Sequence, residues 1–513
     1  MSIKRTAVII TIISLICKLF GFGREIVLAY FFGTSFIVDA YLMASNIPLI
    51  LFGWLTSVSL SFTPIYTDIR EKLGEEKSKL FTNNIMSLVF IVAIICILFG
   101  LIFNKQIVSI IAPGFSGDVF DLTSYYFNIS VWIVLFIAPI QILTSYLNCN
   151  DKFIQSSLAT LAISSVQFLF IFIAGIFNSS ILIYGILFSN LLNFVLVYIF
   201  SNKVNYKFKF KISITTEIKQ TLIIVIPIFI SSMIDQINML VDKSFASGLI
   251  EGSISALNYG SILKTFISTI FSIAIITMVY PMISQAVAEK NMIKVKEIFS
   301  KGTNIIITLF VPITVGAIIL ARPAISFVFE HGEFGSSSAI MTSSAFVMYS
   351  IGLLAVVLRD VITKVFYSIQ DTKSALYIGT FAVLLNIILN IILVKHMGHA
   401  GLALATSLSA IISMPLFFIV LRKKLGPLGL KNTTILFIKS CISTAFMGVV
   451  VYFGFSWLSG ILGDGKISIL LSLALSAVVG GLIYFILMIS LKVKEMDFFI
   501  DIIKRVLVKF AKR

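Results

Sequence analysis

Long apolar runs recur along the whole sequence. A helix that crosses a bilayer needs roughly 20 mainly apolar residues. This chain of 513 residues is 58% hydrophobic and only 12% charged, with a mean hydropathy of +1.06, a composition typical of integral membrane proteins. We therefore predict an all-α polytopic membrane protein with about fourteen transmembrane helices, at 7–31, 36–63, 82–104, 124–147, 155–177, 180–200, 220–245, 256–284, 303–321, 338–367, 374–394, 400–421, 433–456 and 467–491.

Basic residues collect in alternate loops. Lys and Arg precede the first span and follow every even-numbered span up to the twelfth, whereas the loops at 33–35, 247–253 and 331–338 contain neither. This positive-inside pattern predicts that both termini are cytoplasmic, and it explains the net charge of +16 without a nucleic-acid partner. The last residues, 492–513, repeat apolar side chains at helical spacing among Lys and Arg. They predict a basic amphipathic cytoplasmic tail on the anionic lipids of the inner leaflet.

No motif indicates a cofactor, a metal or a catalytic centre. The four cysteines lie in or beside spans without metal or disulfide spacing, and the three histidines fall in predicted outer loops. Phosphate-binding glycine loops, dinucleotide fingerprints, nucleophile elbows and HExxH helices are absent from the sequence. The first apolar run is too long for a cleavable signal peptide. We therefore expect no cofactor, no metal and no enzymatic activity.

Three landmarks recur at nearly one spacing, which indicates an internal duplication. "SFTPIYTDI" with Pro64 resembles "MVYPMISQA" with Pro281, 217 positions later; "IAPGF" resembles "FEHGEF", 219 later; "LNCNDKF" with Asp151 resembles "FYSIQDTK" with Asp371, 220 later. The offset covers six spans, so the halves share one orientation, as in secondary transporters that bind substrate between two lobes. We divide the chain into an N-lobe with spans 1–6 (1–203), a C-lobe with spans 7–12 (204–425), accessory helices 13 and 14 (426–491) and the tail (492–513).

Several charged residues lie inside the predicted spans. A charge at mid-bilayer costs about 2.5–3.5 kcal/mol on insertion scales, so such residues usually face a bundle interior or a wet cavity. Basic side chains in a cavity suit a phosphate or pyrophosphate, because Arg offers a planar fork and Lys a point charge. The candidate substrate-binding residues are Lys18, Arg24, Glu25, Asp39, Lys264 and Arg359, and the candidate ion-coupling residues are Asp235, Asp242 and Asp360.

Arg24 is the leading candidate. Lys18 and Glu25 are seven positions apart and share a helix face, whereas neither residue four positions from Arg24 is acidic. The alternative is structural, with Lys18 paired to Glu25 to hold helices together. Asp242 and Lys243 lie near a span end, so a structural pair or snorkelling to the interface explains them equally well.

An ordered set of motifs points to a known family. The motifs are "CKLFGFGREIVLAYFFG" at 17–33, "DAYLMASNIP" at 39–48, "APGF" at 112–115, "LNCNDKF" at 147–153, "FASGLIEGSISALNYG" at 245–260, "VFEHGEF" at 328–334, "FYSIQDTK" at 366–373 and "GLALATSLSA" at 401–410. Over residues 5 to 425 the chain thereby resembles the MurJ (MviN) lipid II flippases of the multidrug/oligosaccharidyl-lipid/polysaccharide (MOP) exporter superfamily.

The resemblance implies a fold and an activity. It implies fourteen spans, two six-helix lobes in a V around a cationic cavity, and a groove beside spans 13 and 14 for a polyprenyl tail. It also implies that lipid II, the undecaprenyl-pyrophosphate-linked peptidoglycan precursor, moves from the inner to the outer leaflet of the bacterial cell membrane by alternating access. Arg24 matches the family's cavity arginine, Glu25 its neighbouring acid and Asp39 the acid that opens the second span. Lys18 stands where the family usually has arginine.

Two positions depart from the family pattern. Phe52 lies in the stretch of the second span where the family typically has arginine, and Ile262 takes the arginine position of the eighth. Either Lys264 and Arg359 replace those charges, or the cargo is another polyprenyl-linked oligosaccharide, such as a teichoic-type, capsule or O-antigen unit. A multidrug or ion antiporter of the same superfamily would favour twelve spans and an acidic cavity. Coupling to Na⁺, H⁺ or the membrane potential stays open.

Overall fold

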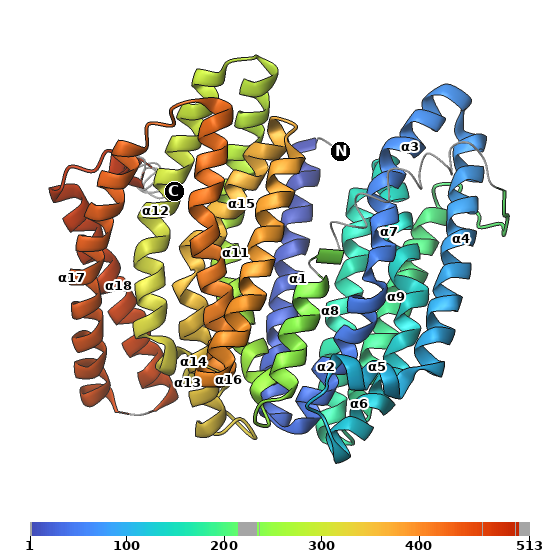
Figure 1. The fold of residues 1–513 in the computed structure, drawn as a ribbon, viewed down its shortest axis with the longest axis horizontal. Helices are drawn as coiled ribbons and strands as arrows, with labels where there is room; N and C mark the ends of the chain where they lie inside the picture. The colour runs from blue at the N-terminus through green and yellow to red at the C-terminus, as the bar shows by residue number, and fades with distance from the viewer. Residues whose placement is uncertain (1–2, 214–232, 235, 464, 498, 502–513) are drawn as a thin grey trace, which may run out of the picture. The chain divides into compact units, whose positions relative to one another are not determined.

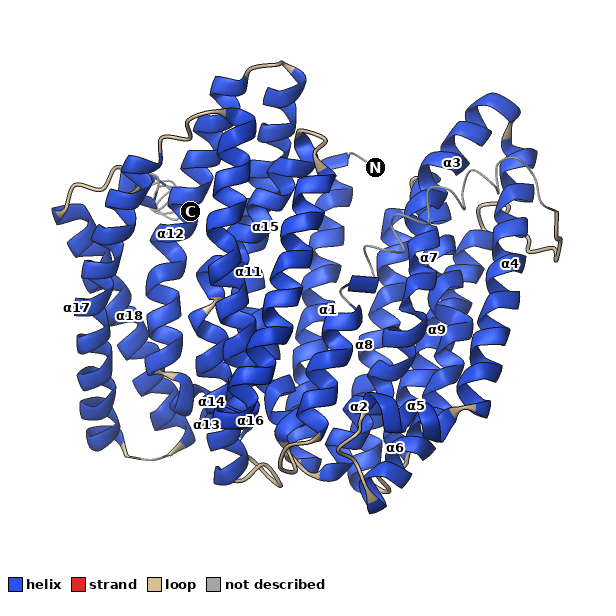
Figure 2. Cartoon of the chain, in the orientation of Figure 1, coloured by secondary structure: helices blue, strands red, loops and turns tan. Residues whose placement is uncertain are grey.

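The computed structural model describes residues 3–213, 233–234, 236–463, 465–497 and 499–501. Within these residues every regular element is a helix and no strand occurs (Figure 2). The chain forms two compact units, one of Met1–Ser255 with His331–Gly335 and one of Ala256–Glu330 with Ser336–Arg513. The all-α fold predicted from the apolar runs is confirmed. The lobe boundaries at 203 and 425 follow the repeat rather than contacts, and they stay a prediction.

The first unit is a bundle in which α1 packs against α8, α8 against α9, and α2 against α6 (Figure 1). The α1–α8 contact is close because Gly175 of α8 lies directly under the ring of Phe31. The elements are α1 (Ile3–Phe32), α2 (Phe36–Phe52), the 3₁₀ turn η1 (Gly53–Thr56), α3 (Ser57–Leu73), α4 (Glu75–Ile102), α5 (Asn104–Ile111), α6 (Gly117–Ser130), η2 (Val131–Ile133), α7 (Val134–Cys149), α8 (Phe153–Ile176) and α9 (Ile181–Asn202).

The second unit has two hydrophobic cores that share α12. One core joins α11, α12, α15 and α16, and the other joins α12, α17 and α18; the last three helices lie side by side in Figure 1. Gly480 of α18 meets Val451 of α17 so closely that an added Cβ would lie 2.3 Å from its Cγ2 atom. The elements are α11 (Ser253–Ala288), α12 (Met292–Ile319), α13 (Ala321–Phe329), α14 (Ser336–Ile351), α15 (Leu353–Ser368), α16 (Thr372–Leu425), α17 (Leu430–Leu462) and α18 (Lys466–Ser490).

Helix boundaries recur between the two units as a duplication requires. Both ends of α12 lie 217 positions after those of α4, and both ends of α15 lie 219 positions after those of α7. The left-handed cap after α7 places Asp151 at φ 59°, and the cap after α15 places Gln370 at φ 60°. Asp151 therefore corresponds to Gln370, so the sequence alignment with Asp371 was wrong by one position.

The helices are long and apolar enough to cross a membrane. Among the described residues nine helices meet that condition, or up to eleven if each of two bent pairs is one span; one such pair, α14 with α15, bends by 47°. Helix α16 contains two predicted spans, 374–394 and 400–421, on either side of a break at Gly398 with φ 54° and ψ −133°. Much of the seventh predicted span lies outside the described residues. The count of fourteen and the cytoplasmic termini stay predictions.

A capped end fixes the start of α16. The side chain of Asp371 accepts hydrogen bonds from the hydroxyl and the amide of Ser374, at 2.7 and 3.1 Å, and lies 3.1 Å from Lys424 Nζ. These contacts, led by the Ser374 hydroxyl, hold the pKa of the Asp371 carboxyl below its usual value, because each favours the charged form. The cap links the first turn of α16 to its last.

Candidate functional site

Arg24 lies in a polar network between α1 and α8. Its Nε donates to Glu25 Oε1 at 3.0 Å, its Nη2 donates to the same oxygen, and its Nη1 donates to Gln167 Oε1. Gln167 in turn donates from Nε2 to the Ser189 hydroxyl of α9 at 3.1 Å. The side chain of Glu25 is only 3% exposed, whereas that of Arg24 is 31% exposed. No residue four positions from Arg24 is acidic, and its acidic partner is instead the adjacent residue.

Asp39 caps the N-terminus of α11. Its Oδ2 accepts from the amide of Gly252 and its Oδ1 from the amide of Ser255, both at 2.8 Å and both buried. These amides are at the N-terminus of α11, where a carboxylate satisfies unpaired donors and complements the helix dipole. Glu251 reciprocates by accepting from the amide of Phe36, the first residue of α2, at 2.8 Å. Asp39, predicted as a substrate contact, thus makes structural hydrogen bonds.

Lys243 joins this cluster from a third helical segment. Lys18 is exposed on α1. Half-buried Lys243, in the helical segment 236–247, interacts electrostatically with Asp39, Asp242 and Glu25. Glu25 therefore interacts with two cations, Arg24 and Lys243, and Asp39 interacts with Lys243. The remaining candidate of this segment, at position 235, lies outside the described residues.

The second unit contains a separate charged cluster on α11 and α15. Lys264 interacts electrostatically with Arg359 and Asp360, and its Nζ lies over the ring of Tyr349, 5.4 Å from the centroid. Arg359 Nε is 3.8 Å from Asp360 Oδ1, and these side chains are 38% and 47% exposed. Lys364 Nζ lies over the rings of Tyr280 and Tyr367, 5.8 and 5.6 Å from their centroids. The structure thus brings together Lys264, Arg359 and Asp360.

The two residues at the usual arginine positions take different roles. Phe52 is 7% exposed and its ring lies next to Gly100 of α4, so it belongs to the packing of the first unit. Ile262 is half-buried on α11, two positions before Lys264. Neither side chain can replace a positive charge.

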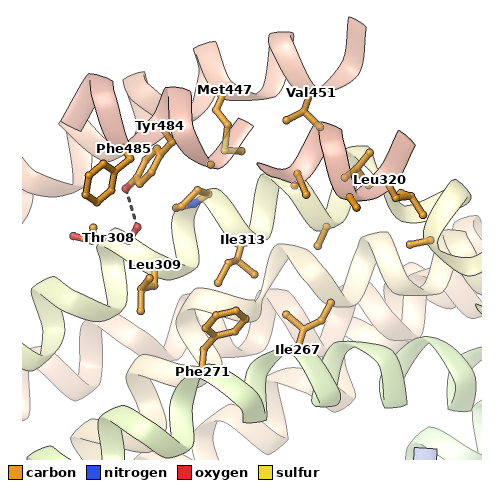
Figure 3. A pocket seen from close by; sticks show the side chains of 18 of the residues that line it. Ile267, Phe271, Thr308, Leu309, Ile313, Leu320, Met447, Val451, Tyr484 and Phe485 are labelled. Atoms are coloured by element: carbon orange, nitrogen blue, oxygen red, sulfur yellow. Dashed lines mark hydrogen bonds between the residues drawn. The ribbon is translucent and has the colours of Figure 1, made fainter. Parts of the chain in front are cut away.

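An apolar groove of about 680 Å³ lies in the second unit. Its walls come from α11 (Ile267, Phe271), α12 (Leu309, Ile313, Leu320), α17 (Met447, Val451) and α18 (Tyr484, Phe485), as Figure 3 shows. The Tyr484 hydroxyl donates to the carbonyl of Thr308 at 2.8 Å, which leaves the lining almost entirely hydrocarbon. Such a surface suits an apolar chain. The described residues contain no group of three or more His, Cys, Asp or Glu that could hold a metal ion.

Sequence reasoning missed two contributors to these sites. Gln167 is an amide in the middle of an apolar span, which is a weak signal, since buried amides more often join helices than bind ligands. Lys243 was interpreted as a partner of Asp242, because sequence proximity could not show that Asp39 and Glu25 approach it from other helices.

Comparison with known proteins gives a consistent assignment. The family model described as "Lipid II flippase MurJ" matches residues 28–471. A Rickettsia prowazekii (strain Madrid E) protein described as "Probable lipid II flippase MurJ" is 27% identical over 428 residues, 82% of this chain and 83% of the relative. The solved structure "Lipid II flippase MurJ, inward closed conformation" is similar with a TM-score of 0.81 at 25% identity, over 94% of this chain and 98% of that one. An inward-facing multidrug resistance MATE family transporter of the MOP superfamily shares the fold, with a TM-score of 0.66 at 15% identity over 81% and 96% of the two chains. Because the family model covers most of its length, this chain belongs to the MurJ family of lipid II flippases.

Proposed function

We propose that this protein is a multi-pass transporter of the bacterial cell membrane that flips lipid II from the inner to the outer leaflet. The observation that carries the proposal is the match of the lipid II flippase family model over residues 28–471, which include parts of both compact units. The cargo has a pyrophosphate, a glycan headgroup and an undecaprenyl tail, so it needs cationic groups and an apolar surface.

Both kinds of surface support the proposal. Arg24 in the first unit, and Lys264 with Arg359 in the second, are the candidate contacts for the pyrophosphate, since all three keep part of their side chain accessible. The groove beside α17 and α18 is the candidate site for the polyprenyl tail. In an alternating-access cycle, the cationic groups would hold the headgroup while the tail stays in an apolar environment. Rocking of the two repeated lobes would carry the headgroup across.

Ion coupling and lipid binding belong to the same proposal. Asp242 interacts with Lys243, and the half-exposed Asp360 interacts with Arg359 and Lys264. These carboxylates are the candidates for binding Na⁺ or H⁺, and movement of charged groups would couple transport to the membrane potential. Binding of the basic tail, predicted over 492–513, to anionic inner-leaflet lipids is a further part of the proposal; Lys492 and Lys494 are exposed, and residues 502–513 lie outside the described part of the chain.

The test is transport of lipid II by reconstituted vesicles, followed by protection of the headgroup from an impermeant reagent. Because Arg24→Gln alone leaves buried Glu25 without its guanidinium, the double variant Arg24→Gln/Glu25→Gln must be measured beside it. If Arg24 binds the pyrophosphate, both variants lose transport about tenfold or more, as expected for a lost charge-assisted hydrogen bond. Recovery in the double variant would show that the pair is structural. Arg70→Ala, which removes a surface contact to the carbonyl of Cys149, is the control that keeps transport.

The same assay decides the identity of the cargo. Phe52 and Ile262 favour a second candidate, another polyprenyl-linked oligosaccharide. Vesicles should therefore be loaded in parallel with lipid II and with a teichoic-type or capsule precursor on the same lipid. Faster transport of lipid II supports the proposal, and transport of the other glycan alone would overturn it.

A further inference from the structure

The chain turns back into the second unit immediately after α18. The amides of Lys492 and Val493 donate to carbonyls in the last turn of α18 at 2.8 and 3.2 Å. This left-handed cap places Lys492 at φ 53°, a conformation usually taken by glycine and costly for other residues. Lys439 Nζ of α17 donates to the carbonyl of Leu491 at 2.7 Å. The turn is therefore held in place by a neighbouring helix.

A polar contact holds the segment that follows the turn. Asn304 Nδ2 of α12 donates to Glu495 Oε1 at 2.6 Å, and the Thr433 hydroxyl of α17 donates to Asn304 Oδ1 at 2.9 Å. Asn304 and Thr433 are only 7% and 8% exposed. Because a buried amide is costly when its donor is unpaired, this network fixes Glu495 against α12.

Apolar side chains seal the same segment. Val493 and Met496 are 7% and 2% exposed and belong to the core of α12, α17 and α18. Phe499 packs against that core and also against the core of α11, α12, α15 and α16. The returning segment 491–499, without residue 498, is thus part of the packed structure.

This returning segment forms one end of the groove. Met496 and Phe499 both line the cavity. Glu495, the residue before Met496, is hydrogen-bonded to Asn304, which lies one helical turn before Thr308 on α12. Met496 and Phe499 therefore lie at the Thr308 end of the lining. The lining runs along α12 from Thr308 to Leu320.

The volume of the groove limits how much of a polyprenyl chain it can hold. At roughly 30 Å³ per water-sized group, a cavity of about 680 Å³ holds on the order of twenty carbon groups. That number is well short of a complete undecaprenyl chain. A chain that enters the groove by its free end therefore keeps most of its length outside, and the part that contacts this lining is that free end.

We propose that Met496 and Phe499 are the floor against which the end of the cargo's polyprenyl chain rests, and that Glu495 is the positioning residue that fixes this floor through Asn304. The proposal rests on the proposed function, which supplies the class of chain. A phospholipid acyl chain would meet the same surface, so the experiment must separate the two.

The probe is undecaprenyl phosphate with a diazirine on its terminal isoprene unit, bound to the full-length protein in nanodiscs. After illumination, mass spectrometry measures labelling of the peptide that contains residues 491–501. We expect labelling there in the wild type. Labelling confined to other peptides would overturn the proposal, and so would equal labelling by phosphatidylglycerol with a diazirine at its acyl terminus.

Three variants separate positioning from mere stability. Glu495→Ala should reduce labelling of the peptide about tenfold, the range expected for a lost hydrogen bond to a charged group. Glu495→Gln keeps the acceptor oxygen and should restore labelling. Asp497→Ala, two positions away and exposed, is the matched control that should leave labelling unchanged. Equal labelling in all four proteins would refute the role of Glu495.

A direct change of the floor covers the case in which Glu495→Ala does not fold. Met496→Ala opens space at the end of the groove, so the label should move from residue 496 to residues beyond it; an unmoved label would overturn the proposal. Labelling reports occupancy rather than transport. If the wild-type protein is labelled in peptide 491–501 but does not flip lipid II, the proposed function is refuted and the floor is not. If it flips lipid II without labelling of this peptide, the role of Met496 and Phe499 as the floor is refuted.

Discussion

Replacement of Asp39 should open the start of α11. In Asp39→Ala the buried amides of Gly252 and Ser255 lose their acceptor, at about 1–3 kcal/mol for each unsatisfied donor. The variant also removes the desolvation penalty of a buried carboxylate, which offsets part of that loss. We expect a net local destabilisation of about 2–4 kcal/mol, and about half of that for Asp39→Asn, which keeps one oxygen acceptor.

Hydrogen exchange measures this local free energy directly. Because 1.4 kcal/mol is a factor of ten, the amides of 252–255 should exchange roughly 30-fold to 700-fold faster in Asp39→Ala. Glu251→Gln is the matched control at the reciprocal cap, since glutamine keeps the acceptor for the amide of Phe36, and exchange should change by no more than about twofold. Unchanged exchange in Asp39→Ala would refute the capping argument, and a loss spread over the whole unit would show global unfolding instead.

Three further perturbations test the packing and the caps. Gly480→Ala should lower the free energy of unfolding by about 1–3 kcal/mol, because the added methyl group clashes with Val451. Gly481→Ala is the control: nothing lies within 4 Å of its added Cβ, so it should raise the free energy of unfolding by about 0.5–1 kcal/mol. Equal thermal midpoints of the two variants in detergent would contradict the α17–α18 contact. The pKa of Asp371 is below its usual 3.8, so its stabilisation is present above that value and is lost as the pH falls through the lower folded-state pKa. Asp371→Asn should therefore lower the midpoint at neutral pH and approach the wild type in acid, and a difference that is constant with pH would argue against the cap. Lys492→Gly removes a positive-φ side chain and should stabilise by roughly 0.5–1 kcal/mol in the same assay.

Hydropathy predicted that the apolar segments are helical better than it predicted where the helices begin and end. The run at 303–321 overlaps α12, which starts eleven positions earlier at Met292 and ends at Ile319. That extension carries Lys294, Lys296 and Lys301 beside buried Val295 and Phe299, so it is amphipathic and hydropathy alone does not detect it. In the same way, no apolar pattern marks the 3₁₀ turn at Gly53–Thr56 inside the second span.

The candidate site was harder to predict because partners come from distant helices. The sequence showed Arg24 as a charge within an apolar run, but its contact with Gln167 joins positions 143 residues apart. Only the packing of α1 against α8 brings them together. The Asp39 cap likewise depends on a loop 213 positions away. A sequence shows which side chains are costly in a bilayer, but folding decides which of them are already paired.

The pairing of these charges changes which of them are best suited to the cargo. Glu25 and Asp39 are 3% and 4% exposed, and each accepts hydrogen bonds from protein donors. A ligand that displaced them would leave a buried charge or amide unpaired, which costs several kcal/mol. Arg359 is 38% exposed, and its carboxylate partner lies as far as 3.8 Å away, while Lys264 has an aromatic ring and no ion pair within 4 Å among the described residues. These two cations can turn to a pyrophosphate at lower cost than Arg24 can. Loss of Lys264 or Arg359 should therefore weaken cargo binding before it affects stability, and loss of Asp39 should do the reverse.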